Sequence, residues 1–200
     1  DVVYILLSPD DSTVEGYQHT YVDSIEPIRQ ALKSHPVKRL IVVSSTRVYG
    51  ENSGETIDDH SEIHPNDAQG HILHNMELLW QKYFPSQCVI VRPTGIYGAS
   101  IDRLKRMAEH TQTYPNIHYS NRIHIDDLAR FLAFLADFEK PHKSYLVANN
   151  APVPLHEVLL WFQSQLDLPL LTLDSAHVSG KKIYAKHLFE TGFQLEHPIC

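Results

Sequence analysis

The chain has 200 residues, of which 42% are hydrophobic and 20% are charged, a composition typical of one globular domain and not of a disordered polypeptide. Its 17 Lys and Arg residues against 24 Asp and Glu residues give a formal net charge of −7, which leaves no basic field for nucleic acid. The longest apolar runs, residues 2–7 and 131–136, are too short to span a membrane. No secretory signal peptide is recognisable. We therefore expect a cytoplasmic protein that binds neither nucleic acid nor membranes.

Four short apolar runs predict β-strands, and longer amphipathic segments between them predict α-helices. The strands are expected at residues 2–7, 39–43, 88–93 and 145–148. The helices are expected at residues 14–34, 66–84, 102–110, 126–136 and 155–166, the first with its N-cap within residues 11–13 and a kink or break at Pro27. Residues 50–65 read as a polar loop, and the tail from residue 170 is short and mixed. Strands that alternate with helices predict an α/β fold with a parallel sheet covered by helices on both faces.

The two cysteines, Cys88 and Cys200, are too few for a disulfide framework, and Cys88 lies in an apolar run where a buried thiol is expected. The 14 histidines raise the question of a metal site. The pairs His60–His64 and His71–His74 have suitable spacings, but the first pair lies in a predicted loop and no His-Glu-x-x-His motif occurs. We therefore predict a histidine-rich surface and no metal site.

Four motifs lie within or directly after the predicted strands or at the start of a predicted helix. Residues 44–50 read Ser-Ser-Thr-Arg-Val-Tyr-Gly, and residues 92–98 read Arg-Pro-Thr-Gly-Ile-Tyr-Gly. Residues 122–129 read Arg-Ile-His-Ile-Asp-Asp-Leu-Ala, and residues 145–149 read Tyr-Leu-Val-Ala-Asn. In order and spacing these motifs resemble those of the NAD-dependent epimerase/dehydratase family, the extended short-chain dehydrogenases. The resemblance implies a Rossmann-type, doubly wound parallel sheet followed by a small substrate-binding portion. Residues 1–148 would be part of the dinucleotide-binding domain, with residues 97–122 on the substrate side, and residues 149–200 would be the substrate-binding portion.

The motifs imply a site at the carboxyl ends of the parallel strands, where ligands of open α/β sheets lie. Ser45, three residues before the Val of Val-Tyr-Gly, matches the hydroxyl that polarises the substrate in the family, and it is the candidate catalytic residue. Arg47, Tyr49, Arg122 and His124 are candidate substrate contacts, although His124 is equally well read as a strand residue packed under the following helix, and Asp127 as a helix cap. The expected cofactor contacts are Leu7, Ser8, Pro9, Ser44, Pro93 and Thr94 near strand ends, together with Gln69 in the helix at 66–84.

The chain departs from the family at the helix that carries the proton relay. Pro65, Gly70 and Glu77 match the family's Pro-x-x-x-Tyr-Gly-x-x-Lys-x-x-x-Glu in register, but Gln69 stands at the Tyr position and Leu73 at the Lys position. Gln has no titratable proton and Leu carries no charge, so the usual relay is missing. The histidines nearby, His71 and His74, fall on the opposite side of the helix from Leu73 and cannot replace it.

The eight glycines do not form the Gly-x-x-Gly-x-x-Gly loop that holds the cofactor pyrophosphate in the family. The resemblance therefore predicts an N-terminal truncation: residues 2–7 match the family's fourth strand, exposed as an apolar edge, and roughly 60 residues are expected upstream. It implies NAD or NADP for the full-length protein but not for this chain alone. We expect an enzyme acting on a nucleotide sugar or another small hydroxyl or carbonyl compound. The rival hypothesis is a non-catalytic dinucleotide-binding or sensor protein, and the helices at 14–34 and 66–84 are the expected homodimer contact.

Overall fold

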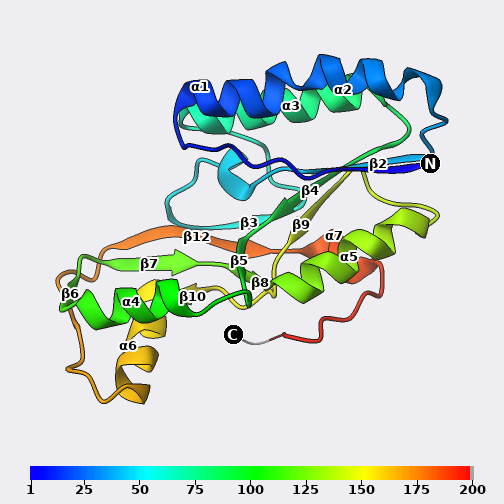
Figure 1. Ribbon diagram of the computed structural model, residues 1–200. Helices are drawn as coiled ribbons and strands as arrows, with labels where there is room; N and C mark the ends of the chain where they lie inside the picture. The colour runs from blue at the N-terminus through cyan, green and yellow to red at the C-terminus, as the bar shows by residue number, and fades with distance from the viewer. Residues whose placement is uncertain (199–200) are drawn as a thin grey trace.

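A four-stranded, fully parallel sheet forms the centre of the computed structural model, which describes residues 1–198 (Figure 1). Its strands, in spatial order, are β1 (Val2–Ile5), β2 (Arg39–Val43), β4 (Cys88–Pro93) and β9 (Ser144–Val147). Every residue of β4 is buried, as are four of the five residues of β2, which explains why both read as continuous apolar runs. The predicted α/β class and the four predicted strands are confirmed. β1 lies at the edge of this sheet with Tyr4 and Leu6 exposed, as expected.

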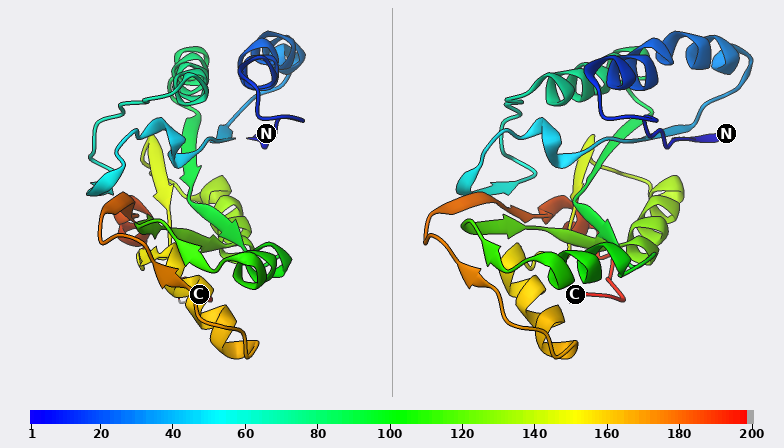
Figure 2. Two further views of the ribbon diagram at one scale, coloured as in Figure 1. Left: turned by 90° about the vertical axis from the view of Figure 1, so that its left-hand side faces the viewer. Right: turned by 60° about the vertical axis from the view of Figure 1, so that its left-hand side comes forward.

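Two helical segments cover one face of the first sheet and lie side by side in both views of Figure 2. The first consists of α1 (Val14–Tyr17), the π-helical η1 (Gln18–Asp23), α2 (Ile25–Ala31) and the 3₁₀ turn η2 (Leu32–Ser34). The second is α3 (Ala68–Tyr83), whose buried side carries Leu73, Met76 and Trp80. Thr13 caps α1 through its side chain, as predicted. The predicted interruption at Pro27 is found just before it, since a proline cannot donate a hydrogen bond to the carbonyl four residues earlier.

The helix α5 (Ile125–Asp137) packs against β2, and the helix α7 (Lys186–Glu190) packs against β9. The N-cap of α5 is His124, whose Nδ1 accepts a hydrogen bond from the amide of Asp126, so the prediction of Asp127 as the cap is wrong. Asp127 is fully buried and accepts the backbone amides of Glu196 and His197, each at 2.8 Å. Burial raises the pKa of Asp127, while those two amides, His197 and Arg130 lower it, with a net lowering. Asp127 therefore anchors the C-terminal tail and does not begin the helix.

A second sheet lies beside the first and contains β10 (Val153–Pro154), β7 (Ile117–Ser120), β12 (Val178–Tyr184) and β3 (Ser53–Asp58), in that order. β12 pairs in parallel with both β3 and β7, and β10 is antiparallel to β7. The prediction of a loop at residues 50–65 is wrong over β3, because only Ile57 of this strand is buried and the strand shows no apolar run. The sheet joins strands from both sides of residue 148, and the division of the chain at that point stays a prediction.

Apart from the short helix that directly follows β2, the remaining elements complete a lower layer around the second sheet (Figure 1). They are η3 (Thr46–Val48), β5 (Gly95–Tyr97), α4 (Asp102–His110), β6 (Thr113–Tyr114), β8 (Arg122–His124), α6 (Leu155–Gln165) and β11 (Thr172–Leu173). β5 pairs with β8, β6 pairs with β11, and α4 packs on α6 around a small core of Ala108, Leu159 and Leu171. None of the helices within residues 1–198 combines the length and apolar character needed to cross a bilayer. Cys88 is buried in β4, and Cys200 lies outside the described residues.

Candidate functional site

A polar cavity of about 410 Å³ lies between the two sheets, at the carboxyl ends of β2 and β4. The segment after β2 and the start of α3 form one side, and the second sheet forms the other. The residues that line it are Thr46, Arg47, Tyr49, Gly50, Glu51, Asn52, Asn66, Asp67, Thr94, Gly95, His118, Tyr119, Ser120, Asn121, Gly180, Lys181 and Ile183. Most of these side chains carry hydrogen-bonding groups, so the cavity suits a small polar ligand.

Arg47 is fixed at the rim of the cavity by partners from two helical segments. Its Nε lies 3.0 Å from one carboxylate oxygen of Asp67 and 3.1 Å from the other. Its guanidinium also donates to the hydroxyl of Tyr17 at 3.4 Å and lies over that ring. Asp67 in turn caps α3 by accepting the amide of Gly70. The predicted substrate contact Arg47 therefore lies in the cavity wall, with its charge already balanced by Asp67.

Lys181 reaches the cavity because β12 has a bulge directly before it. The pairing register with β3 shifts between Gly180 and Lys181, and Gly180 has φ +74°, a conformation that favours glycine. A Cβ on Gly180 would collide with the backbone oxygen of Tyr119. The Lys181 ammonium donates to the backbone carbonyl of Tyr49 and, within residues 1–198, forms no ion pair within 4.0 Å. Burial lowers the pKa of Lys181, while the carboxylates of Glu51, Glu55 and Asp67 oppose that effect.

A buried ion pair supports the backbone of Tyr49 from below. Glu77 on α3 receives two hydrogen bonds from Arg92 of β4, at 2.9 and 2.7 Å. Arg92 also donates to the hydroxyl of Tyr49 at 3.0 Å, and the Tyr49 side chain is buried. The Tyr49 hydroxyl is turned toward Arg92 in the core, and burial raises its pKa, while Tyr49 still contributes to the cavity lining; its role as a substrate contact stays a prediction. Glu77, Arg92 and Tyr49 hold the carbonyl that receives Lys181.

The predicted cofactor contacts lie near the ends of the first three strands of the sheet. Ser44, directly after β2, is buried and its Oγ has no hydrogen-bond partner within residues 1–198. Ser8 is exposed, while Leu7 and Pro9 are half-buried in the segment after β1. Pro93 is the buried last residue of β4, and the hydroxyl of Thr94 donates to the carbonyl of Val147 at 3.1 Å. The unpartnered Ser44 hydroxyl fits a bound group that offers a hydrogen-bonding atom at the end of β2.

Ser45, the candidate catalytic residue, forms the N-cap of η3. Its Oγ accepts the amide of Arg47 at 3.2 Å, which leaves the hydroxyl proton free to donate. Ser45 is half-buried and lies next to Thr46 and Arg47 of the cavity wall. Ser45 itself is not among the residues that line the cavity, and its role in polarising a substrate oxygen stays a prediction.

Gln69 and Leu73, at the family's Tyr and Lys positions, have separate structural roles. The Gln69 amide donates to the backbone carbonyl of Ser12 at 3.0 Å and so ties the start of α3 to the segment that follows β1. Leu73 is buried in the core beneath the first sheet's helices. Neither side chain supplies a titratable proton to the strand ends.

Arg122 and His124 lie on β8, away from the cavity wall. Arg122 is buried, and His124 caps α5, as described above. The His124 ring stacks on His197 at a centroid distance of 3.7 Å and meets Tyr97 edge-on at 5.1 Å. Arg47 and Thr94 both line the cavity, Arg122 pairs with the lining residue Gly95 without lining the cavity itself, and His124 lies in a separate cluster with Tyr97 and His197. The packing alternative for His124 describes its observed surroundings.

Sequence reasoning missed the residues that the second sheet contributes, above all Lys181, Asn121 and His118. His118 receives or donates a hydrogen bond with Ser179 at 2.9 Å, and Asn121 bonds to the backbone of β12 at residues 181 and 183. One signal was available: a glycine within a strand-like segment indicates a bulge or a close backbone approach, and Gly180 precedes Lys181.

Comparison with known proteins gives relatives in the same structural class. No protein-family model matches the chain. Protein YeeZ of Escherichia coli strain K12 is 26% identical over 188 residues, which cover 89% of this chain and 65% of that protein. The chain therefore spans less than two thirds of the length of this curated relative.

Solved structures are similar over nearly the whole chain. A Methylobacillus flagellatus protein, named for the NAD-dependent epimerases/dehydratases, is 29% identical with a TM-score of 0.81, covering 92% of this chain and 68% of that one. MoeE5, solved with UDP-glucose and NAD, has a TM-score of 0.79 at 18% identity over 98% of this chain and 75% of its own. A UDP-N-acetylglucosamine 4-epimerase from Methanobrevibacter ruminantium M1, solved with UDP-N-acetylmuramic acid, has a TM-score of 0.78 at 16% identity, covering 98% of this chain and 71% of its own.

Proposed function

We propose that this chain, whose motifs and fold resemble the NAD-dependent epimerase/dehydratase family, forms the substrate side of a nicotinamide-dependent enzyme. The observation that carries the proposal is the polar cavity between the two sheets, which opens at the carboxyl ends of β2 and β4. A cofactor bound along these strand ends would lie beside a small ligand in the cavity. The proposed substrate is a nucleotide sugar or another small compound with hydroxyl or carbonyl groups.

Residues of this chain fit one side of such a cofactor. The buried Ser44 hydroxyl without a partner and the exposed Ser8 lie where the strand ends would meet it, together with Pro9 and Pro93. The pyrophosphate loop, Gly-x-x-Gly-x-x-Gly, does not occur in the 200 residues, so these contacts alone would hold NAD or NADP weakly. When bound, the nicotinamide supplies hydride transfer.

Two residues of this chain are placed to handle the substrate oxygen. Ser45 can donate its free hydroxyl proton, and so stabilise charge that develops on a carbonyl or carbinol oxygen. Lys181 can exchange a proton with the substrate, because its ammonium lies at the cavity with no carboxylate within 4.0 Å among the described residues, and burial lowers its pKa. We propose that Lys181 takes the proton-transfer role that Gln69 and Leu73 cannot perform. Arg47, already balanced by Asp67, orients polar groups at the rim.

The alternative function is a sensor that binds the dinucleotide and performs no chemistry. The specific observation that favours it is the structural role of Gln69. Its side-chain amide donates a hydrogen bond to the backbone carbonyl of Ser12 and supplies no proton to the site. Tight NAD(P) binding without turnover across a broad panel of sugars and carbonyl compounds is the result that this alternative predicts.

The deciding experiment measures product formation and reduction of NAD and NADP by the protein as its gene encodes it, against a panel of UDP-sugars and small alcohols. The proposal expects turnover that falls at least tenfold in Ser45→Ala and in Lys181→Met. A matched control is Lys182→Met, because Lys182 neighbours Lys181 on β12 but lies over the ring of Tyr119. Turnover that is unchanged in both cavity variants would contradict the assignment of these residues.

The helical face formed by α1, α2 and α3 is proposed as a homodimer contact. Val14, Leu78 and Tyr83 on these helices are exposed apolar side chains. Their burial against a second copy would remove apolar surface from water.

A further inference from the structure

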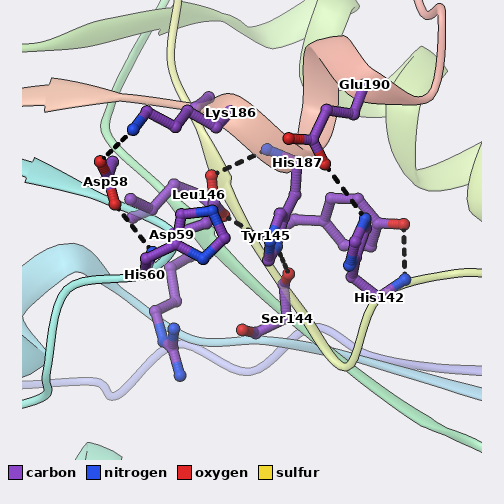
Figure 3. A network of polar contacts seen from close by, with 12 residues as sticks. Asp58, Asp59, His60, His142, Ser144, Tyr145, Leu146, Lys186, His187 and Glu190 are labelled. Carbon is purple, nitrogen blue, oxygen red and sulfur yellow. Dashed lines mark hydrogen bonds and ion pairs between the residues drawn. The ribbon is translucent and has the colours of Figure 1, made fainter.

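Two histidines and a glutamate gather where α7 meets the start of β9. His142 comes from the segment before β9, and His187 and Glu190 come from α7 (Figure 3). One possible ligand atom from each of the three residues lies within 4.8 Å of the others. Imidazole nitrogens and carboxylate oxygens are the usual partners of zinc and similar divalent ions. His142 is far from His187 and Glu190 in the sequence, so the spacing of histidines along the chain does not reveal the group.

His187 is held in the tautomer that a metal ligand needs. Its Nδ1 lies 3.0 Å from the backbone carbonyl of Ser144 and 3.6 Å from the carboxylate of Asp59. Both neighbours accept hydrogen bonds, so Nδ1 carries the proton and Nε2 keeps its lone pair. A bond from the second ring nitrogen to a carbonyl or carboxylate is the support that metal-binding histidines use.

Asp59 fixes the position of this histidine within the fold. Its side chain is 1% exposed, and its two oxygens accept the backbone amides of Leu146 at 2.7 Å and of His187 at 3.0 Å (Figure 3). The buried carboxylate thus joins β9 to α7 and sets the ring of His187 against the segment that carries His142. The support for the ligand is therefore built from buried backbone contacts and does not depend on exposed side chains.

The side chains of His142 and Glu190 are exposed to solvent, so they can change their rotamers to bind an ion. Their side chains are 43% and 54% exposed, and the His142 Nε2 lies 3.4 Å from a Glu190 oxygen. The rings of His142 and His187 stack in parallel, with centroids 3.7 Å apart and 3° between their planes. Lone pairs of stacked rings run side by side, so an ion can be shared only when His142 turns about its side-chain torsions. Its exposure permits this turn, while His187 stays fixed.

A second group, His124, Asp126 and His197, has comparable distances between its possible ligand atoms. It differs in the hydrogen bonding of its first histidine. The Nδ1 lone pair of His124 already accepts the amide of Asp126 as the cap of α5. A cation bound there would have to break the helix cap. In His187 the Nε2 lone pair is free to bind an ion, whereas in His124 the Nδ1 lone pair is already used by the helix cap. We therefore consider only the cluster around His187 as a metal site.

We propose that His142, His187 and Glu190 form a binding site for one divalent ion of the zinc type, which fastens α7 to the start of β9. Three protein ligands leave at least one coordination position for water. The ion requires neutral imidazoles, so binding releases protons and weakens as the pH falls.

Calorimetric titration of the purified chain with zinc chloride tests the proposal, using His142→Gln and Glu190→Gln. Both side chains are exposed, so both variants should fold, which circular dichroism verifies. The matched controls are His64→Gln, which removes an exposed histidine 2.9 Å from Glu62, and His197→Gln, which alters the second cluster. We expect one zinc per chain, at least tenfold weaker binding in each ligand variant, and less than a twofold change in each control.

Heteronuclear NMR of the imidazole rings gives a second measurement. Zinc should shift the ring resonances of His142 and His187 together and leave those of His64 unchanged. The proposal is overturned by the absence of saturable binding, or by His142→Gln and Glu190→Gln variants that bind zinc as tightly as the controls. Because this test reads metal binding alone, its result is independent of the proposed enzymatic function.

Discussion

Replacing Glu77 with Gln tests whether the buried ion pair beneath the cavity organises the molecule. The side chains of Glu77 and Arg92 are 2% and 6% exposed, and their two hydrogen bonds measure 2.9 and 2.7 Å. The variant keeps the shape of the side chain but leaves the Arg92 charge buried without a counter-ion. Removing one partner of such a pair costs about 3–5 kcal/mol, a large part of the roughly 5–15 kcal/mol that stabilises a typical domain.

Urea unfolding followed by circular dichroism measures this loss. With a slope of about 2 kcal/mol per M, the midpoint should fall by about 1.5–2.5 M. The matched control is Glu26→Gln, which removes the surface partner of Arg29 and should leave the midpoint unchanged. The double replacement Glu77→Leu with Arg92→Met removes both charges and should recover much of the lost stability.

Two results would refute this reasoning. One is a Glu77→Gln midpoint within about 0.5 M of the wild type, which corresponds to about 1 kcal/mol. The other is a double variant that is no more stable than Glu77→Gln, since the penalty would then not arise from an uncompensated charge.

Three further predictions follow from single positions. Gly180→Ala should lower stability by at least about 2 kcal/mol in urea unfolding and displace Lys181, because φ is +74° and the added Cβ meets the Tyr119 carbonyl; unchanged stability would contradict the bulge. Asp127→Asn should cost about 1.5–3 kcal/mol at pH 7 and speed proteolysis of the tail. Folding lowers the pKa of Asp127, so its contribution to the free energy of unfolding is complete at pH values above the unfolded pKa of about 3.9. This contribution is lost as the pH falls through the folded pKa, so the stabilities of the variant and the wild type should become equal in acid. Burial raises the pKa of Cys88 to about 12, so in a Cys200→Ser background a thiol reagent should react only after denaturant is added; rapid reaction of the native protein would contradict the packing of β4.

The centre of the first sheet could be predicted from sequence because β2 and β4 are almost entirely buried. β2 and β4 appear as uninterrupted apolar runs, and the helices that cover them keep a regular apolar side, as in Leu73, Met76 and Trp80. Motifs directly after these strands then located Ser45, Arg47 and Thr94 near the cavity.

The second sheet could not be predicted in the same way, because its strands are polar and are paired across long sequence separations. β3 buries Ile57 alone, and β12 contains two adjacent lysines. Lys181 lies in the cavity only because β12 pairs with β3 and β7, more than 100 and about 60 residues away. Asp127 shows the same limitation: its position suggested a cap, but its partners are the amides of the C-terminal tail.

The most direct test of the proposed function is hydride transfer by the protein as its gene encodes it, in wild type, Ser45→Ala, Lys181→Met and the control Lys182→Met. With NAD and NADP over a panel of UDP-sugars and small alcohols, the products are separated by chromatography and reduced nicotinamide is followed by absorbance, because epimerisation and dehydration leave no net reduced cofactor. Our account predicts turnover of at least one panel member, reduced at least tenfold by each cavity substitution and retained in the control. Cofactor binding without turnover of any panel member, or turnover that is indifferent to both Ser45→Ala and Lys181→Met, would contradict it.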